Sequence, residues 1–304
     1  MFIPGNSYMQ SKFGFNIELT NICVLKCPEC PRTQLINQYP RYWKNYSLTL
    51  DSLKNFIDID LTNSQIMLCG NHGDVIYHKD FINIVRWLKD QGSHLIINTN
   101  GSHKPLIWWQ ELTELLNDND TIVFSIDGTP DNFTQYRIGA DWTSIQVGIE
   151  SAVASKAQTA WKYIVFNYNE NTIEEARSIS NMLGIDRFEL EYSDRHDTDQ
   201  YKPSEQYVGL KFYDKNTLGG SDETRIIKPK CWDNQHHYIS ADGYYMPCHY
   251  MSNKKLWYKT PFGKDKKKYD ITKTKLSHII SDLESFYSEI DKNPLSICKW
   301  ACND

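Results

Sequence analysis

The 304-residue chain has no long hydrophobic run. None of its apolar stretches approaches the roughly 20 residues that a membrane-spanning helix needs. Its first residues lack the charged region and the apolar stretch of a secretory signal peptide. It also has no internal repeat, and no low-complexity tract apart from a lysine-rich stretch. These absences argue against a membrane protein, a secreted protein and a repeat array, and they favour a globular protein of the cytoplasm.

The chain also lacks a large excess of positive charge. Its net charge is -5, and 13% of its residues are aromatic. Nothing in this balance predicts a nucleic-acid partner. The local exception runs from Lys254 to Lys275, where lysines gather around Tyr258, Phe262 and Tyr269. A solvated insertion explains this stretch better than a phosphate-binding surface does.

Eight cysteines are present, which could form four disulfides in a secreted protein. Disulfide-dense scaffolds are usually small, however, and a chain of this length can build its own hydrophobic core. The cysteine content therefore favours a reducing cytoplasm and metal ligation. Cys69 is the odd thiol. Because it ends an apolar strand-like stretch, we expect a small buried core residue there, with a catalytic thiol or extra ligand as the alternative.

Apolar stretches of strand length alternate with amphipathic stretches over the first two-thirds of the chain. Strands separated by helices form βαβ units and a parallel sheet. Six such units predict an α/β fold, a partial (β/α)6 TIM-type barrel two units short of closure. The predicted strands are Phe15–Thr20, Gln65–Cys69, Leu95–Thr99, Thr121–Asp127, Tyr163–Asn167 and Arg187–Glu191. The predicted helices are Leu50–Ile59, Asp80–Gln91, Pro105–Leu116, Trp142–Ala154 and Thr172–Leu183.

Local signals mark several element ends. Thr49 is a candidate first residue for one helix, and Thr172 with Glu175 is a candidate capping box for another, which ends at Gly184. Further along, Asp242-Gly243 predicts a two-residue turn between the strand-like flanks of a hairpin, His237–Cys248.

Periodicity fades beyond the sixth unit. We therefore expect three parts: residues 1–200 as the barrel, 201–230 as a connector and 231–304 as a small C-terminal α+β domain. The last part contains the predicted hairpin and a final helix, Leu276–Ile290.

Three cysteines follow the first predicted strand closely, in Cys23-Val-Leu-Lys-Cys27-Pro-Glu-Cys30. Three thiolates so close together can hold three corners of an iron–sulfur cluster and leave the fourth iron open for a reacting molecule. Their place after a strand is also where parallel barrels carry their active sites. The alternatives are a zinc knuckle and three unrelated buried thiols.

The spacing C-x3-C-x2-C resembles the signature of the radical S-adenosylmethionine (SAM) superfamily. The resemblance implies a [4Fe-4S] cluster on Cys23, Cys27 and Cys30 that binds SAM. It also implies that reductive cleavage of SAM yields a 5′-deoxyadenosyl radical, which abstracts hydrogen from the substrate. One departure is Glu29, which stands where the family usually has an aromatic residue.

The resemblance extends to the loop after the second strand, Cys69-Gly-Asn-His-Gly-Asp74. It looks like a variant of the Gly-Gly-Glu-Pro motif that holds the amino group of SAM. Gly70, Asn71, Gly73 and Asp74 are accordingly the candidate SAM contacts. A plain glycine-rich turn is the alternative.

Further candidates for SAM binding follow the third and fourth strands. Asn100, Ser125 and Asp127 lie where polar side chains would face the barrel mouth, and Asp127-Gly128 could equally be a turn. Arg137 resembles the arginine that binds the SAM carboxylate, for which a guanidinium has the right fork geometry. A surface ion pair is the alternative for this arginine.

The C-terminal cysteines form a second pattern. Cys231, Gly243 and Cys248 resemble the opening of the SPASM module, and Cys298-Lys-Trp-Ala-Cys302 supplies two more thiolates. Four cysteines resemble the shorter twitch version, which implies one auxiliary [4Fe-4S] cluster. Complete SPASM modules have seven cysteines, and a four-thiolate zinc site is the alternative.

The expected function is a net oxidation by a radical SAM enzyme of the dehydrogenase type, with the auxiliary cluster transferring the electron. The expected partners are a small-molecule or peptide substrate and an electron donor such as flavodoxin or ferredoxin. A peptide-modifying enzyme is the first alternative; because the predicted barrel starts near residue 14, no separate leader-binding domain is expected, and a small molecule is favoured. A non-catalytic iron–sulfur or zinc protein is the second.

Overall fold

A computed structural model of the chain describes residues 14–191, 199–207, 236–252, 260–292, 294, 295, 298 and 302. Within these residues, eight strands form one sheet in the order β6-β5-β4-β3-β2-β1-β7-β8. The strands are β1 (Gly14–Ile17), β2 (Gln65–Leu68), β3 (His94–Thr99), β4 (Thr121–Ser125), β5 (Gln158–Ile164), β6 (Arg187–Glu191), β7 (His236–Ile239) and β8 (Tyr245–Met246).

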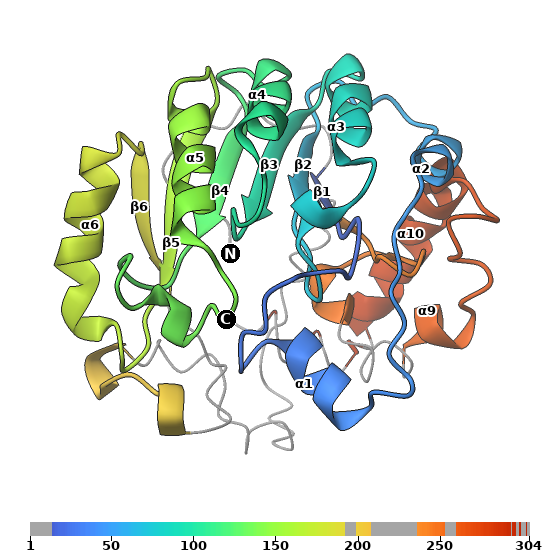
Figure 1. The fold of residues 1–304 in the computed structure, drawn as a ribbon. Helices are drawn as coiled ribbons and strands as arrows, with labels where there is room; N and C mark the ends of the chain where they lie inside the picture. Colours follow the sequence, from blue (N-terminus) through green and yellow to red (C-terminus); the bar gives the residue numbers. More distant parts are fainter. Residues whose placement is uncertain are drawn as a thin grey trace.

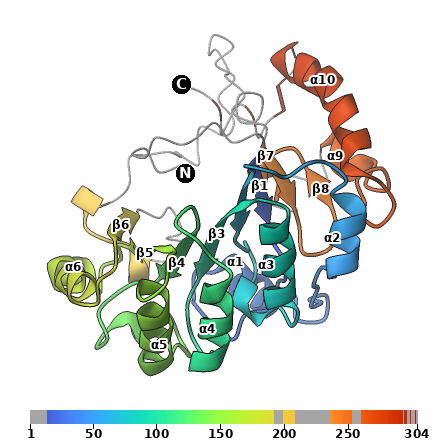
Figure 2. The same cartoon turned by 90° about the horizontal axis from the view of Figure 1, so that it is seen from above.

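The first six strands are parallel, and each lies beside its neighbour in sequence. The α-helices are α1 (Pro31–Gln38), α2 (Leu50–Phe56), α3 (Phe81–Asp90), α4 (Leu106–Glu114), α5 (Trp142–Val153), α6 (Ile173–Met182), α9 (Pro261–Lys264) and α10 (Leu276–Lys292). Figures 1 and 2 show α3 to α6 along one side of the sheet. This sequential order with helices on one side is the arrangement expected of successive βα units.

Short 3-10 helices occupy several connections: η1 (Val75–Tyr77), η2 (Phe133–Gln135), η3 (Glu170–Thr172), η4 (Asp199–Tyr201), η5 (Glu205–Tyr207) and η7 (His249–Ser252). The core lies between the sheet and its helices, where large side chains such as Trp109 and Trp161 are fully buried. Burying one such side chain stabilises the fold by roughly 1.5–3 kcal/mol. Within the described ranges, no helix combines the length and the apolar character needed to cross a membrane.

The fifth strand begins earlier than its apolar pattern predicts. The prediction was Tyr163–Asn167, whereas β5 spans Gln158–Ile164. Asp186 accepts hydrogen bonds from both the backbone nitrogen and the hydroxyl of Thr159, at 2.7 and 2.8 Å, and so anchors a polar strand start. At the other end, Asn169 accepts a hydrogen bond from the backbone of Phe166 and pulls the chain into a turn.

Of the two helix starts predicted from capping residues, the one at Thr49 is confirmed and the capping box at Thr172 is wrong. Thr49 caps α2, with Ser52 completing a capping box. The predicted box of Thr172 and Glu175 is wrong, because the Thr172 hydroxyl donates to the carbonyl of Asn169 and does not cap α6. Gly184 ends this helix with a φ of 79°, which only glycine adopts easily. Helix α1, directly after Cys30, was not predicted.

The C-terminal hairpin joins the main sheet. Strand β7 pairs in parallel with β1, and β8 pairs antiparallel with β7. The turn contains three residues, not two, because Ser240 and Tyr244 pair on either side of Ala241, Asp242 and Gly243. Gly243 takes a positive φ of 84°, as the third position of such a turn requires. The hairpin thus lengthens the sheet beyond β1.

The final helix, α10, is hydrogen-bonded to the segment that follows α2. Asp58, which follows α2, accepts hydrogen bonds from the backbone and the hydroxyl of Ser277 in α10, at 2.9 and 2.6 Å. Figure 2 shows α2, α9 and α10 around β7 and β8 at one end of the sheet. Of the lysine-rich stretch, residues 253–259 lie outside the described residues. Beyond them, Lys268 pairs with Asp282 of α10 at 2.7 Å.

Candidate active site at the carboxyl edge of the sheet

Cys23, Cys27 and Cys30 lie in the loop between β1 and α1. The backbone nitrogen of Cys30 donates to the carbonyl of Cys27 at 3.2 Å, and Pro31 begins the helix immediately afterwards. Proline suits the first position of a helix because its missing N–H would have no partner there. The segment therefore makes a tight turn that holds the last two thiols close to a helix start.

The three thiols contact one apolar cluster. Cys27 is buried in it, and Cys23 and Cys30 pack against it; its other buried members are Leu25, Tyr136, Phe166 and Tyr201. Burial and neighbouring charges raise the pKa of Cys23 to about 12, and burial raises that of Cys27 to about 11. The charge of the Cys27 thiolate contributes to the raised pKa of Cys23, and that of Cys30 contributes to the raised pKa of Cys27. The three thiols therefore share one apolar environment, and their protonated forms are favoured unless a positive charge binds to them.

Backbone contact fixes the glycine-rich loop after β2. A Cβ atom on Gly73 would lie 2.1 Å from the carbonyl oxygen of Thr20, so only glycine fits there. The next residue, Asp74, donates its backbone N–H to the carbonyl of Ile22 at 2.9 Å. Gly70 lies against the backbone of Gly73 in the same way. These glycines hold the loop tightly against the segment that leads into Cys23.

Asp74 connects this loop to the end of β3. Its buried carboxylate accepts hydrogen bonds from the Thr99 hydroxyl at 2.9 Å and from the Asn100 backbone at 2.6 Å. The Asn100 side-chain amide lies 2.5 Å from Asp74 and 3.7 Å from Cys23 Sγ. Burial raises the pKa of Asp74. Asp74 therefore positions Asn100 beside the first cysteine, and its own contact with SAM stays a prediction.

Asn71 contacts the C-terminal part of the chain. Its side-chain amide donates to the hydroxyl of Tyr238 in β7 at 3.2 Å and also contacts the Ser252 hydroxyl. Tyr238 in turn donates to the carboxylate of Glu18 at 3.2 Å. This chain of hydrogen bonds joins the glycine-rich loop to the hairpin. A SAM contact for Gly70, Asn71 or Gly73 likewise stays a prediction.

Asp127 and Arg137 form a buried ion pair beside Cys27. Arg137 Nε donates to Asp127 Oδ2 at 2.7 Å, and Asp127 Oδ1 accepts from the Ile164 backbone at 2.9 Å. Burial would lower the pKa of Arg137, but the charges of Asp127 and Cys27 raise it. The positive charge of the arginine also lowers the pKa of Cys27 and so opposes the effect of burial on that thiol. Arg137 is thus held at the cysteine turn and is no surface ion pair.

Ser125 is the last residue of β4 and is half-buried. Its hydroxyl makes no hydrogen bond with any residue that the structure describes, so it could accept an outside partner. Its role in SAM binding also stays a prediction.

Three of the C-terminal cysteines lie close together. Burial, followed by the charges of Cys302 and Cys298, raises the pKa of Cys248 to about 12. Burial and then Cys302 raise that of Cys298 to about 11. The backbone of Cys302 donates to the carbonyl of Cys298 at 2.9 Å, one helical turn away. Cys231, the fourth predicted ligand, lies outside the described residues.

The described thiols of the two cysteine groups are not arranged around a single ion. In the parts of the chain that the structure describes, no three His, Cys, Asp or Glu side chains are arranged to hold one metal. An iron–sulfur cluster differs because its thiolates bind different irons, so it needs neighbouring but separate sulfurs. The buried, mutually interacting thiols and the adjacent Arg137 fit such an anionic cluster.

Glu18 is a residue that the sequence analysis missed. It follows β1 and is buried, accepting hydrogen bonds from the backbone of His72 at 2.7 Å and of Ala241 at 3.4 Å. A charged residue inside the apolar stretch Phe15–Thr20 was the available signal. Buried carboxylates are uncommon without a structural or functional partner.

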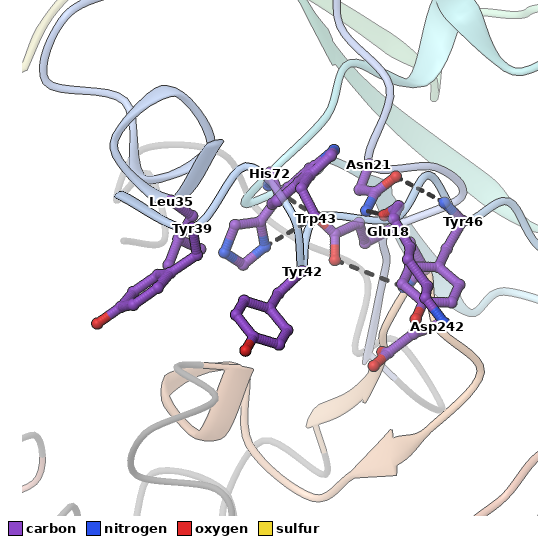
Figure 3. Close-up of a pocket in the computed structure, with 11 residues that line it drawn as sticks. Glu18, Asn21, Leu35, Tyr39, Tyr42, Trp43, Tyr46, His72 and Asp242 are labelled. Atoms are coloured by element: carbon purple, nitrogen blue, oxygen red, sulfur yellow. Dashed lines mark hydrogen bonds and ion pairs between the residues drawn. The ribbon is translucent and has the colours of Figure 1, made fainter. Parts of the chain in front are cut away.

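A cavity of about 560 Å³ opens beside Glu18. Its walls come from the loop after α1, from the loop after β2 and from the hairpin turn (Figure 3). The lining residues are Glu18, Asn21, Leu35, Tyr39, Tyr42, Trp43, Lys44, Tyr46, His72, Ala241 and Asp242. The cavity therefore lies at the same carboxyl edge of the sheet as the cysteine turn.

No family profile and no curated protein matches the sequence. Solved structures do match the fold. The structure of anSMEcpe with bound AdoMet has a TM-score of 0.58 at 14% identity and covers 95% of this chain and 88% of that one. Streptococcus suis SuiB bound to S-adenosylmethionine has a TM-score of 0.52 at 13% identity, covering 87% and 72%. SuiB bound to precursor peptide SuiA gives 0.53 at 12%, covering 86% and 67%. At these identities the likeness is one of fold.

Proposed function

We propose that this chain is a radical SAM enzyme whose [4Fe-4S] cluster is bound by Cys23, Cys27 and Cys30. The observation that carries the proposal is the place of the three cysteines. They lie in one loop at the carboxyl edge of a parallel sheet, with their sulfurs gathered on one apolar cluster. The fold likeness to radical SAM enzymes with bound AdoMet supports the same conclusion.

The cluster, when bound, supplies the electron that cleaves SAM to methionine and a 5′-deoxyadenosyl radical. The chain's own residues prepare the place for it. Arg137 offsets negative charge at Cys27, and Asp127 holds the arginine in position. Asn100 contacts Cys23, and the rings of Tyr136, Phe166 and Tyr201 keep water away from the thiols. Excluding water protects a reactive radical from side reactions.

SAM itself is proposed to lie beside this turn. Its amino group would face the loop of Gly70, Asn71, Gly73 and Asp74, and its carboxylate would meet Arg137. The ribose hydroxyls would meet polar side chains at the ends of β3 and β4, among them Asn100 and Ser125. Support comes from the gathering of these positions at one edge of the sheet.

A second cluster is proposed at the C-terminal end of the chain, bound by Cys231, Cys248, Cys298 and Cys302. Cys248 packs against the apolar cluster that contains Cys298, and Cys302 follows Cys298 by one helical turn; both observations support the proposal. A cluster with four protein ligands has no open iron, so it would accept the electron left on the substrate and favour net oxidation. Flavodoxin or ferredoxin would supply the first electron.

Peptide modification is the second candidate for the reaction. Among the structures with this fold, one holds the precursor peptide SuiA and another the peptide Cp18Cys; the latter has a TM-score of 0.50 at 13% identity. Both candidates use the same cysteine turn and differ in the substrate.

Anaerobic reconstitution with iron and sulfide, followed by dithionite and SAM, tests the proposal. We expect about eight irons per chain, as two four-iron clusters require, and slow formation of 5′-deoxyadenosine. Cys27→Ala should abolish 5′-deoxyadenosine formation. Cys298→Ala should bind less iron but still form 5′-deoxyadenosine. Bound zinc, or clusters without SAM cleavage, would instead indicate a metal-stabilised binding protein.

A further inference from the structure

Glu18 begins a chain of hydrogen bonds that runs through the hairpin to the glycine-rich loop. Its buried carboxylate accepts from the backbone of His72 at 2.7 Å and from the hydroxyl of Tyr238 at 3.2 Å. Burial alone would raise the pKa of Glu18, but the hydrogen bonds and charge of His72 lower it below the usual 4.5. An ionised carboxylate can only accept hydrogen bonds. Tyr238 must therefore donate its one hydroxyl proton to Glu18.

This donation fixes the orientation of the Asn71 side chain. Tyr238 has no second proton, so its oxygen can only accept a hydrogen bond from the next group in the chain. That group is the Asn71 amide, and its nitrogen lies 3.2 Å from the Tyr238 oxygen. The hydroxyl of Ser252 contacts the same nitrogen. If the amide were reversed, two oxygens would face each other with no proton between them.

The other end of this amide, the side-chain oxygen of Asn71, remains available to a ligand. Within the described ranges, no group donates a hydrogen bond to this oxygen, and Asn71 is half-buried, not enclosed. Three residues later in the same loop, Asp74 donates its backbone N–H to the carbonyl of Ile22, the residue before Cys23. The oxygen therefore belongs to a loop that is fixed against the cysteine turn.

An oxygen held in this way suits an ammonium group. An ammonium group has three donors and no acceptor, so it binds to oxygens and has no use for an NH2 group. A side chain that is already held in its binding orientation loses little freedom when the ligand arrives, which increases affinity. In SAM, the one ammonium group is the amino group of its methionine part.

We propose that Glu18, Tyr238 and Ser252 are positioning residues, which hold Asn71 so that its side-chain oxygen binds the amino group of SAM. The proposal rests on the proposed radical SAM function. Glu18 acts through Tyr238 without touching the ligand. Ser252 lies four residues after Cys248, so the segment that contains one C-terminal cysteine also supports the SAM loop.

Equilibrium dialysis of the reconstituted full-length chain, without reductant, tests the proposal. The two probes are S-adenosylhomocysteine and its desamino analogue, which differ only in the amino group. The ratio of their dissociation constants measures what this group contributes to binding. We expect the wild-type chain to bind S-adenosylhomocysteine at least about tenfold more tightly. Asn71→Ala should reduce the ratio about fivefold or more, because a hydrogen bond to a charged group is lost.

Variants of the positioning residues separate this role from a purely structural one. Ser252→Ala and Tyr238→Phe should each reduce the ratio about threefold or more and leave the binding of the desamino analogue unchanged. A general loss of structure would weaken both probes alike. Ser252→Thr keeps a hydroxyl and should retain the wild-type ratio. Ser281→Ala is the matched control, because the Ser281 hydroxyl donates to the carbonyl of His278 within α10.

A double variant shows whether Ser252 acts through Asn71. Added to Asn71→Ala, Ser252→Ala should cause no further loss in the ratio, because the group that it positions is already absent. Additive losses, or an unchanged ratio in Asn71→Ala, would overturn the proposal.

The proposal and the radical SAM function can fail separately. If the wild-type chain cleaves SAM and all of these variants keep its ratio, the positioning of Asn71 is refuted and the radical SAM function stands. If the wild-type chain binds neither SAM nor either probe, the radical SAM function itself is refuted.

Discussion

Asn100 lies beside Cys23, with its side-chain nitrogen 3.7 Å from the cysteine sulfur, although 77 residues separate the two in sequence. The same amide lies 2.5 Å from the buried carboxylate of Asp74. The first cysteine of the turn is therefore positioned by the ends of β2 and β3 as well as by its own loop. A carboxylate that holds an amide against a sulfur leaves little freedom to either group.

Replacing Asn100 tests this arrangement. Asn100→Ala removes the side-chain donor and leaves Asp74 with one buried hydrogen bond unmade, which should cost about 1–3 kcal/mol of the free energy of unfolding. Urea unfolding of the metal-free chain measures this cost, and iron content after reconstitution should fall as well. Asn119→Ala, an exposed asparagine between α4 and β4, should change the free energy of unfolding by less than about 0.5 kcal/mol. Equal effects of the two variants would contradict the assignment.

The ion pair of Asp127 and Arg137 should contribute strongly to stability. Asp127→Asn removes one partner and leaves the guanidinium buried, so we expect a loss of about 3–5 kcal/mol in urea unfolding. The half-buried pair of Lys162 and Glu191 is the matched comparison, because its atoms lie 3.2 Å apart with more solvent around them. Glu191→Gln should cost less than about 1 kcal/mol. A small loss in Asp127→Asn would show that water reaches the arginine.

Gly73 should tolerate no side chain. In Gly73→Ala the new Cβ would lie 2.1 Å from the Thr20 carbonyl, and backbone atoms cannot move aside as a flexible side chain can. We expect a loss of about 3 kcal/mol or more, read from the thermal and urea midpoints. Gly92→Ala is the control: its φ is 75° but its nearest neighbour lies 3.5 Å away, so backbone strain of about 1–2 kcal/mol is the whole cost. A loss in Gly73→Ala no larger than this would contradict the close approach.

Because of Glu18, the free energy of unfolding should fall as the pH is lowered. Burial alone would raise its pKa, but the hydrogen bonds and charge of His72 and the Ala241 backbone lower it below the usual 4.5. A lowered carboxyl pKa contributes stability that is fully present above 4.5 and is lost as the pH falls through the lowered value.

The difference in unfolding free energy between the wild-type chain and Glu18→Gln should therefore be largest near about pH 7. It should shrink as the pH is lowered below about 4.5. Urea unfolding at a series of pH values measures it, with the exposed Asp51→Asn as control. A difference that grows toward acid would contradict the predicted direction.

Part of the fold could be read from the sequence because the signals are local. The alternation of apolar stretches predicts six parallel βα units, and six parallel strands occur in sequential order. The predicted start of β5 was wrong because Asp186 anchors Thr159 from 27 residues away, an interaction that no local pattern contains. The capping box at Thr172 was wrong for a similar reason, since Asn132 and Tyr163 compete for its hydroxyl.

The sequence by itself determined the cysteine turn, because three thiols within eight residues must lie near one another whatever the rest of the chain does. Tertiary structure alone decided what surrounds them. It placed Arg137 at Cys27, Asn100 at Cys23 and β7 beside β1. It also brought Tyr238 to Glu18 across 220 residues, so that the hairpin completes one wall of the cavity. Such long-range contacts follow from the packing of the whole sheet, for which a local pattern holds no information.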